Sequence, residues 1–248
     1  MSNVVIWNSD QSANIANIYN NGSPQTTYTV TPQNWWRLNA DSVYTPSAPN
    51  YTTALSFNGT TNDVTVGGSS GVATTDSSSL SIWFTTTATT SFKGLFGLDT
   101  TSLNFYSSII GTKNSGGSAV KIQVYLSPTY YQVTPVINDG NWHNLVLTYD
   151  HSASLFKAYT DGIETYSATY SQPSTGMNLK YIGTTAYSGG AHSKWEGRLS
   201  NASIWNTALT PAQVSTLFNF GTPETNISFS PTAWWKLDNT TTGIQDSS

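Results

Sequence analysis

Cysteine is absent from this sequence, and charged residues make up only 9% of its 248 positions. Without cysteine there is no disulfide framework, no thiolate metal site and no thiol nucleophile, so stability must come from packing alone. No apolar run approaches the roughly 18 residues that a membrane-spanning helix requires. The first residues, MSNVVIWNSD, lack the charged and apolar regions of a secretory signal. We therefore expect no membrane insertion.

Positive charge is scarce as well, with nine lysines and arginines against 13 aspartates and glutamates and a net charge of −4. The basic residues are scattered along the chain, so no basic stripe is available to neutralise phosphates. Nucleic acid is therefore not an expected partner. Threonine, serine, asparagine and glycine fill the polar positions instead, which predicts a neutral surface rich in hydroxyl groups.

What the sequence does contain is a repeat that links its two ends. IWN at 6–8 returns at 204–206, and the Trp-Trp pair at 35–36 returns 199 positions later at 234–235. Seven further residues recur at the same spacing: Ile15, Ile18, Tyr19, Gly22, Pro24, Pro32 and Leu38, matched by Val214, Leu217, Phe218, Gly221, Pro223, Pro231 and Leu237. Internal repeats indicate tandem architectures, so a period of about 199 residues predicts one complete unit plus an overlap.

Between the repeated ends, short runs alternate apolar and polar residues, the pattern of antiparallel strands. In residues 120–126 the apolar side chains fall on one face and Lys121, Gln123 and Tyr125 on the other, and residues 80–84 alternate in the same way. Asp161-Gly162 separates two such runs and tolerates the positive φ of a two-residue turn. We predict a β-hairpin there.

One helix is predicted near the end of the chain. Residues 210–213 read Thr-Pro-Ala-Gln, a capping box with proline at the first helical position, and the apolar residues at 214, 217 and 218 fall on one face. Gly221 is expected to end this helix. The first copy, residues 12–20, keeps the apolar face but lacks the Thr-Pro cap, so we expect a weaker helix there.

Many strands with one or two short surface helices predict an all-β fold, a two-sheet antiparallel β-sandwich of jelly-roll type. The repeat then suggests the boundaries: residues 1–30 correspond to the end of a preceding unit, 31–229 to a complete domain and 230–248 to the start of a following unit. Each end carries a strand and a helix suited to the same place in the fold. One copy therefore closes its own domain while the other is spare and could link units.

Several segments occur together in a characteristic order: SLSIWFTTT with GLFGL, NWHNLVLTYD, FKAYTDG, LKYIG, WEGRLSNASIWNTALTPAQVSTLF and WWKLDNTTTGIQDSS. In these segments, which span nearly the whole chain, the sequence resembles the laminin-G-like members of the concanavalin A-like lectin/glucanase superfamily. Similar WWKLD units occur in repeated, low-charge domains of phage and marine microbial surface proteins. The resemblance implies a jelly roll with that tandem organisation.

The chain departs from this family pattern at two places. Family members usually carry acidic residues after the Gly-x-Leu of the closing strand, where this chain has Ser200 and Asn201. Relatives often follow WWKLD with an Asp-Ser-Gly-Asn-Gly loop that binds calcium, whereas this chain reads DSS at 246–248 and NADS at 39–42. The first copy lacks the glycines of that loop.

Glucanases of this fold require two carboxylates a few ångströms apart. Each of the three glutamates is isolated in the sequence, with no E-x-D-x-E spacing: Glu164, Glu196 and Glu224. His143 has no acid or nucleophile beside it in the sequence, while His151 and His192 adjoin Asp150 and Ser193. Adjacency in sequence does not make a catalytic triad, which is defined by spatial arrangement. We predict that the chain is not an enzyme.

Calcium is the one metal that the sequence leaves open, and no other cofactor is expected. Asp41, Asp63 and Asp139 lie near expected turns, where they could join backbone carbonyls in an oxygen cage. Solvated turn aspartates are the alternative interpretation.

Carbohydrate binding uses aromatic faces that stack on sugar rings, and aromatic residues make up 13% of the chain. Most of the tryptophans lie in strand patterns, where they are expected to pack between the sheets. The candidates for a sugar platform lie in or next to expected loops: Tyr130, Tyr131, Tyr187 and Trp195. Trp195 has a competing interpretation, because its place before Glu-Gly matches a core aromatic of the family.

The leading hypothesis is a structural or adhesive module of a virion, such as a phage fibre or capsid decoration, or of a microbial surface protein, that links tandem units. The alternative is a lectin that binds host-cell glycans through loops around 128–132 and 185–195. The expected location is a virion or the cell exterior, and the expected partners are neighbouring repeats or protomers, including a homo-oligomer, or glycans. A glycoside hydrolase is the third interpretation, supported only by the fold.

Overall fold

The computed structural model describes residues 4–7, 9–19, 34–36, 54–67, 72–98, 110–114, 117–126, 129–171, 178–187, 190–221, 223–240 and 242–248. The chain divides into two compact units, unit 1 (Met1–Pro46) and unit 2 (Ser47–Ser248). The sequence suggested boundaries after residues 30 and 229 instead. No helix among these residues is both long and apolar enough to cross a membrane.

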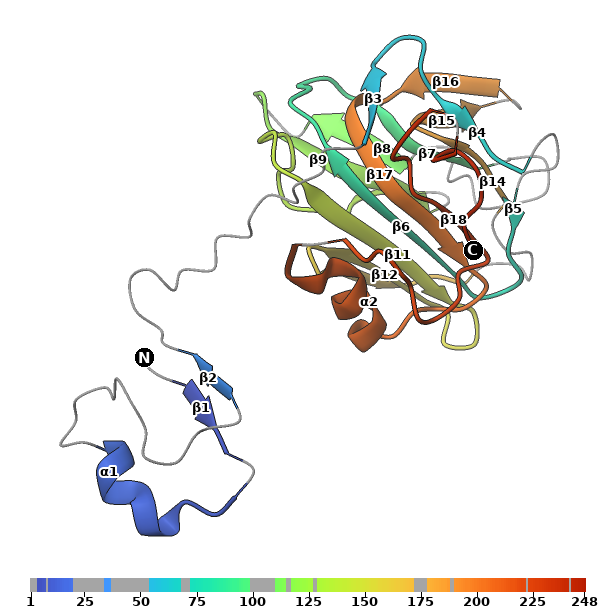
Figure 1. Cartoon of the computed structure of the whole chain (residues 1–248). Coiled ribbons are helices and arrows are strands. Elements are labelled where there is room, and N and C mark those ends of the chain that lie inside the picture. The colour runs from blue at the N-terminus through green and yellow to red at the C-terminus, as the bar shows by residue number, and fades with distance from the viewer. Residues whose placement is uncertain are drawn as a thin grey trace. The chain divides into compact units, whose positions relative to one another are not determined.

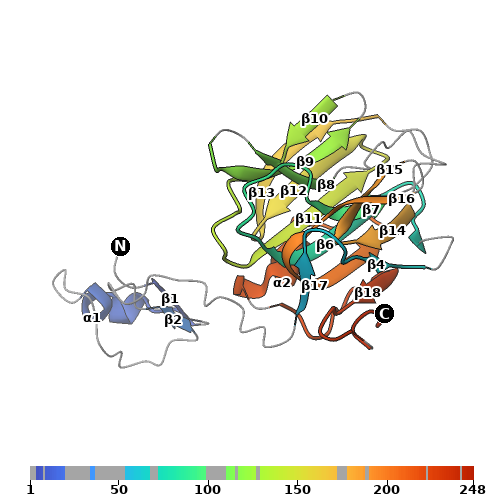
Figure 2. The ribbon, with the colours of Figure 1, turned by 90° about the horizontal axis from the view of Figure 1, so that it is seen from above.

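Unit 2 is a sandwich of two antiparallel sheets, as the jelly-roll prediction required (Figures 1 and 2). The first sheet has the order β13-β12-β11-β6-β17-β18, and β3 also pairs with β17. Its strands are β3 (Leu55–Asn58), β6 (Ser78–Thr85), β11 (His143–Asp150), β12 (Leu155–Thr160), β13 (Ile163–Thr169), β17 (Glu196–Trp205) and β18 (Ala233–Trp235).

The second sheet has the order β10-β9-β8-β7-β14-β4, and β5 also pairs with β14. Its strands are β4 (Val64–Thr65), β5 (Val72–Ala73), β7 (Gly94–Leu98), β8 (Ile110–Asn114), β9 (Val120–Leu126), β10 (Thr129–Gln132) and β14 (Asn178–Ile182). A separate hairpin of β15 (Thr184–Tyr187) and β16 (Gly190–Lys194) packs on β7. A Cβ at Gly94 would collide with the backbone of Thr184 and Thr185, so glycine allows this close approach.

The core lies between the two sheets, where the predicted alternation is confirmed. Val120, Ile122 and Val124 of β9 and Leu80 and Ile82 of β6 are all fully buried in one apolar cluster. The cluster also contains aromatic rings from both sheets. Because so many large apolar side chains are removed from water, each contributing roughly 1.5–3 kcal/mol, packing alone stabilises a chain without disulfides.

The hairpin predicted at Asp161-Gly162 is confirmed. Asp161 has φ 53° and Gly162 has φ 76°, and the turn connects the paired strands β12 and β13. Two consecutive positive φ angles define a type I′ turn, whose twist matches that of the strands. This local signal was therefore sufficient to place the turn.

Helix α2 (Pro211–Phe218) is also confirmed, with the side chain of Thr210 accepting from the backbone N–H of Gln213 in a capping box. The prediction that Gly221 ends the helix is wrong by two residues. Asn219 adopts the left-handed conformation at the C-cap, with φ 40°, and Gly221 ends the 3-10 turn Asn219–Gly221 that follows. Asparagine is the non-glycine residue best suited to that conformation.

Helix α2 covers the outer face of the first sheet near β11 and β12 (Figure 1). Its apolar residues Val214 and Leu217 are buried with Val146 and Tyr159 of those strands. The nearby ring of Phe218 stacks on Trp83 with centroids 5.9 Å apart. The helix therefore forms a second, smaller apolar cluster outside the main core.

The C-terminal copy of the repeat completes the first sheet. In β18, Trp235 pairs with Ala202 of β17 and lies in the main core. Beyond it, the carbonyl of Leu237 accepts from the N–H of Leu55 at 2.9 Å, which joins β18 to the start of β3. Residues 233–237 therefore belong to the sandwich in this structure, whereas the sequence suggested a boundary after residue 229.

Unit 1 contains the other copy of the repeat. Strands β1 (Val4–Ile6) and β2 (Asn34–Trp36) form a two-stranded antiparallel sheet, with a 3-10 turn Ser12–Asn14 and helix α1 (Ile15–Tyr19) between them. Gln11, at the start of this helical segment, makes no side-chain cap. Asp10 Oδ1 accepts from the backbone N–H of Ser12 at 2.9 Å instead, and the helix itself is only five residues long, in agreement with the weaker helix that the sequence predicted.

Candidate functional site

The outer face of β9 and β10 presents two stacked tyrosines, Tyr125 and Tyr130, here called the tyrosine platform. The two residues are directly paired across the strands, and their ring centroids lie 4.5 Å apart at an angle of 43°. Neighbouring β9 residues Val124 and Leu126 point into the core, so alternation places Tyr125 on the outer face. Tyr130 is 52% exposed, one of the most exposed large hydrophobic residues of the described chain.

Polar groups surround the tyrosine platform. Gln132 on β10 is exposed on the same face as Tyr130, and it pairs with Gln123 of β9, two residues from Tyr125. Lys121 follows on the same face of β9. Tyrosine offers an apolar ring with a polar tip, and amides and hydroxyls can bond to the edge of a ligand held on that ring. The face thus has the chemistry to hold a flat, hydroxylated ligand.

The structure separates the four aromatic residues predicted as a sugar platform. Tyr130 lies on the tyrosine platform, whereas Tyr131 is half-buried on the opposite face, where its ring lies 5.4 Å from that of Tyr166 and packs against the core. Tyr187 ends β15, whose hairpin packs on β7. Strand β7 is three strands from β10, or about 14 Å. The side chain of Tyr187 lies outside the described residues.

Trp195 does not offer a ligand surface. Its side chain is fully buried, its ring meets Phe84 edge-on at 5.5 Å, and its indole N–H donates to the carbonyl of Thr85 at 3.3 Å. The competing interpretation as a core aromatic therefore agrees with its placement. Tyr125, by contrast, was not predicted, although its position on the polar face of 120–126, close in sequence to Tyr130, carried the signal.

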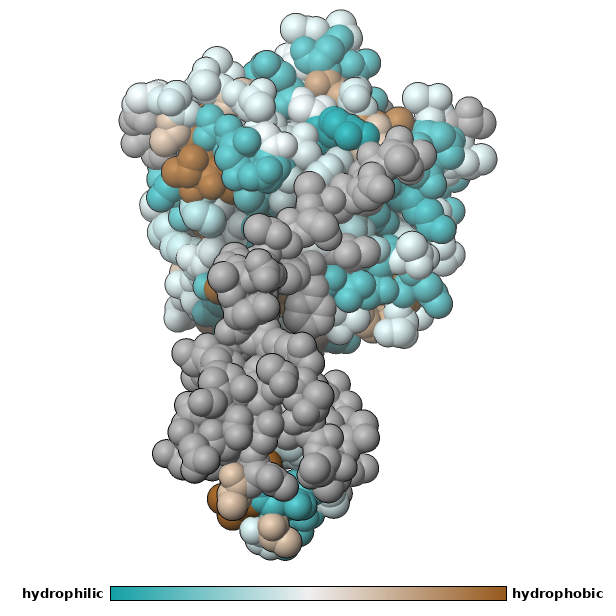
Figure 3. All heavy atoms as spheres, turned by 60° about the vertical axis from the view of Figure 1, so that its left-hand side comes forward, coloured by the Kyte–Doolittle hydropathy of each residue, from teal (hydrophilic) through white to brown (hydrophobic). Residues whose placement is uncertain are grey.

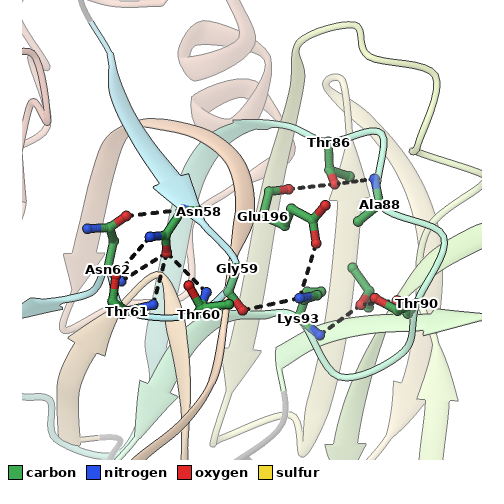
Figure 4. Close-up of polar contacts among 11 residues, drawn as sticks. Asn58, Gly59, Thr60, Thr61, Asn62, Thr86, Ala88, Thr90, Lys93 and Glu196 are labelled. Carbon is green, nitrogen blue, oxygen red and sulfur yellow. Dashed lines mark hydrogen bonds and ion pairs between the residues drawn. The ribbon is translucent and has the colours of Figure 1, made fainter.

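The loops at one end of the sandwich form a dense polar network (Figure 4). The side-chain oxygen of Asn58 accepts from the backbone N–H groups of Thr60 and Thr61 at 3.0 and 2.9 Å. Nearby, Lys93 Nζ lies 3.1 Å from Glu196 Oε2 and donates to the carbonyl of Gly59 at 3.2 Å. These contacts satisfy the turn's own backbone and charges, so the network fixes the loop.

Two of the three glutamates form ion pairs with lysines. Glu196 pairs with Lys93, and Glu164 pairs with Lys157 Nζ at 2.7 Å on the other sheet edge. A glycosidase needs a second carboxyl group opposite the first and a raised pKa on the acid. Where a carboxyl pKa is shifted among the described residues, at Asp139 and Asp150, it is lowered. Glu164 and Glu196 are thus engaged by lysines and not by a second carboxyl group.

His143 lies between two aspartates. Its Nδ1 is 2.8 Å from Asp161 Oδ2, and its Nε2 is 3.2 Å from Asp139 Oδ1. Burial lowers the pKa of His143, but the hydrogen bonds and negative charges of Asp161 and Asp139 outweigh it and leave the pKa raised above 6.5. Asp161 Oδ1 also accepts from the backbone N–H of Asn144 at 2.8 Å. The cluster fastens the β12–β13 turn to β11.

The three aspartates considered for calcium are not brought together among the described residues. Asp63 Oδ1 pairs with Lys194 Nζ at 2.5 Å, while Asp139 accepts from the backbone and side chain of Asn141 and contacts His143. Asp41 lies outside the described residues. Across the described chain, no group of three or more histidine, aspartate or glutamate side chains is placed to hold a metal ion.

Comparison with known families agrees with this architecture. The model of the concanavalin A-like lectin/glucanases superfamily matches residues 57–215, which is most of unit 2. The chain therefore belongs to this family.

Solved structures share the fold at low sequence identity. A heptameric SAP-like pentraxin from Limulus polyphemus superposes with a TM-score of 0.53 and 18% identity over 75% of this chain and 92% of the pentraxin. A proposed carbohydrate binding protein from Bacteroides ovatus gives a TM-score of 0.53 and 18% identity over 77% of this chain. The match spans 52%, about half, of that Bacteroides protein. At this identity the likeness concerns the fold.

Proposed function

We propose that the chain is a non-catalytic adhesive module that binds carbohydrate through the tyrosine platform. The observation that carries this proposal is the stacked pair Tyr125 and Tyr130, with Tyr130 52% exposed, on a sheet face that also carries Gln132 and Lys121. Exposing an aromatic ring to water does not stabilise the fold. It does leave the ring accessible to stack on the apolar face of a sugar.

Two further features support a neutral, hydroxylated ligand. Charged residues make up only 9% of the sequence, and the described part of the face seen in Figure 3 is mostly hydrophilic or neutral with isolated hydrophobic patches. The fold also carries other carbohydrate-binding proteins, as the Bacteroides ovatus protein is proposed to be. Fold alone is only an association, so the proposal depends on the platform itself.

A glycan array probed with the full chain tests this function. We expect binding to at least one glycan class, lost about tenfold or more in Tyr130→Ala and retained in Tyr130→Phe, which keeps the ring. The matched control is Ile163→Ala, because Ile163 is 69% exposed on the other sheet. Silence of the wild-type chain across the array, or equal binding by Tyr130→Ala, would contradict the proposal.

A second candidate function is a structural module that links tandem units of a virion, such as a phage fibre or capsid decoration, or of a microbial surface protein. The observation that favours it is the repeat of 199 residues, whose two copies form the same strand pairing in unit 1 and unit 2. The complete open reading frame tests this idea. Further copies at the same period are expected, and a single copy among unrelated domains would exclude an array.

A further inference from the structure

The strand pairing in unit 1 reproduces that in unit 2 residue by residue. Val4 pairs with Trp36 as Ala202 pairs with Trp235, and Val5 pairs with Trp35 as Ser203 pairs with Trp234. The third pair, Ile6 with Asn34, matches Ile204 with Ala233. The preceding residues agree too, since SN at 2–3 matches SN at 200–201. Unit 1 is therefore a second copy of the strand–helix–strand segment that closes the sandwich.

The helices of the two copies differ in what covers them. Val214 of α2 is fully buried, whereas its counterpart in α1, Ile15, is 63% exposed. Ile18 is half-buried, whereas its counterpart Leu217 is 4% exposed. The same apolar face is thus covered in unit 2 and largely open in unit 1. Leaving a large aliphatic side chain in water forgoes the stabilisation that its burial supplies.

Unit 2 shows what covers this face. Val146 of β11 and Tyr159 of β12 pack against Val214 and Leu217. Beside them, the strand that precedes α2 pairs with β6, with Ser203 opposite Ser81 and Ile204 opposite Leu80. In unit 1 the equivalent strand β1 pairs with β2, and the described residues place no other strand beside it. The uncovered helix face and the unpaired strand edge correspond to the same missing neighbour.

We propose that unit 1 closes a second sandwich of this same fold, supplied by the adjacent repeat, and binds it through two surfaces. Strand β1 adds to the edge of that sandwich's counterpart of β6, and the face of α1 that carries Ile15 and Ile18 covers its counterparts of β11 and β12. The acceptor must be another sandwich, because β17 and α2 already occupy these places in unit 2. This inference rests on the second proposed function, a module of a tandem array.

A chimera supplies the missing partner. Residues 47–199 placed directly ahead of residues 2–248 put unit 1 in the register that residues 200–245 have in unit 2. We expect two folded sandwiches, and amide hydrogen exchange in Val4–Ile6 slower by about tenfold or more than in the 248-residue chain, because the strand gains a partner. Exchange in β1 unchanged by the added residues would overturn the proposal.

Ile15→Asp gives a second measurement. In the 248-residue chain it should leave the Tm unchanged, because Ile15 is 63% exposed. In the chimera it should selectively lower the Tm of the added sandwich. The matched variant Val214→Asp should lower the Tm of unit 2 in both proteins. Equal effects of Ile15→Asp in both proteins would contradict docking.

A control chimera separates folding failure from docking failure. It joins residues 47–245 to the full chain, so that the added sandwich carries its own closing segment. If this control folds as two sandwiches and the chimera closed by unit 1 does not, the proposal is wrong.

Light scattering on the 248-residue chain tests whether the partner is instead a second copy of this chain. A dimer that Ile15→Asp dissociates would assign the surface to a second copy of this chain instead of the adjacent repeat. If the open reading frame contains further copies of the repeat, the second proposed function stands even when the chimera or the light scattering contradicts the docking of unit 1.

Discussion

His143 Nδ1 lies 2.8 Å from Asp161 Oδ2, so a histidine of β11 is held by the residue that begins the β12–β13 turn. The contact makes the stability of unit 2 depend on pH. Because the pKa of folded His143 is raised, its contribution to the free energy of unfolding is complete below pH about 6.5 and is lost as pH rises through the folded pKa.

We therefore expect the Tm to fall as pH rises above about 6.5, and this fall to disappear in His143→Gln. His151→Gln removes a histidine outside the cluster and should retain the fall. Thermal melts across this pH range measure the effect. The lowered pKa of Asp139 acts at the acidic end, where its contribution is lost as pH falls below its ordinary range. A pH dependence that survives His143→Gln would exclude this cluster as its source.

Neighbouring tyrosines on β10 should differ in their effect on stability. Tyr131 packs against Tyr166 and the core, so Tyr131→Ala is expected to cost about 2 kcal/mol in the free energy of unfolding. Tyr130→Ala removes a half-exposed ring stacked on Tyr125 and should cost less than about 1 kcal/mol. Urea denaturation of the two variants provides the comparison. The reverse order would show that β10 faces the other way.

Substitution of Gly162 in the Asp161-Gly162 turn should lower the free energy of unfolding for two reasons, backbone strain and a close contact with Phe218. Gly162 has φ 76°, and a Cβ there would lie 3.1 Å from Phe218 Cδ1. Gly162→Ala is thus expected to destabilise the chain by about 1 kcal/mol or more. Gly117 has φ 58° with nothing within 4 Å of its Cβ position, so Gly117→Ala carries only the backbone strain. The two free energies of unfolding should differ, and equal values would exclude the contact with Phe218.

The ion pair between Asp63 and Lys194 is largely shielded from water, with side-chain exposures of 20% and 14%. Asp63→Ala should cost about 2 kcal/mol, because it leaves a poorly solvated lysine without its counter-charge. The double variant Asp63→Ala, Lys194→Ala should recover part of that loss. A double-mutant cycle by denaturant unfolding gives the coupling energy, and strict additivity would mean that the two charges do not interact.

Removal of divalent cations should leave the Tm unchanged. Asp63 pairs with Lys194, and Asp139 bonds to Asn141 and His143, so both carboxylates already have partners within the protein. Melting the chain with EDTA and with added calcium tests this expectation. A calcium-dependent rise of several degrees would require a site elsewhere, with Asp41 as the remaining candidate.

Features encoded locally could be read from the sequence. The alternation in 120–126, the Asp161-Gly162 turn and the capping box at 210–213 each depend on residues that are close together in the chain. The structure confirms all three. Aromatic residues were harder to assign, because the face to which Tyr131 or Trp195 points depends on strand register and on what the opposite sheet supplies.

The domain boundaries depended on a choice that the sequence could not make. Both copies of the Trp-Trp segment have the pattern suited to the same place beside β17, so the sequence pattern does not favour either copy. The structure uses the C-terminal copy, which α2 and its loops connect to β17 by residues 206–232. The N-terminal copy pairs instead with β1, inside unit 1. The side-chain pattern alone does not distinguish the two copies.

The hydrogen bond from the Leu55 N–H to the Leu237 carbonyl joins the start of β3 to the segment that follows β18. In an array pulled along its length, force would arrive at β3 and depart at β18, both of which lie along β17. Tension would then be transmitted through one sheet edge, and the strands beyond β17 would be spared. A fibre built from such units would resist extension through its edge hydrogen bonds and keep the tyrosine-bearing sheet undistorted.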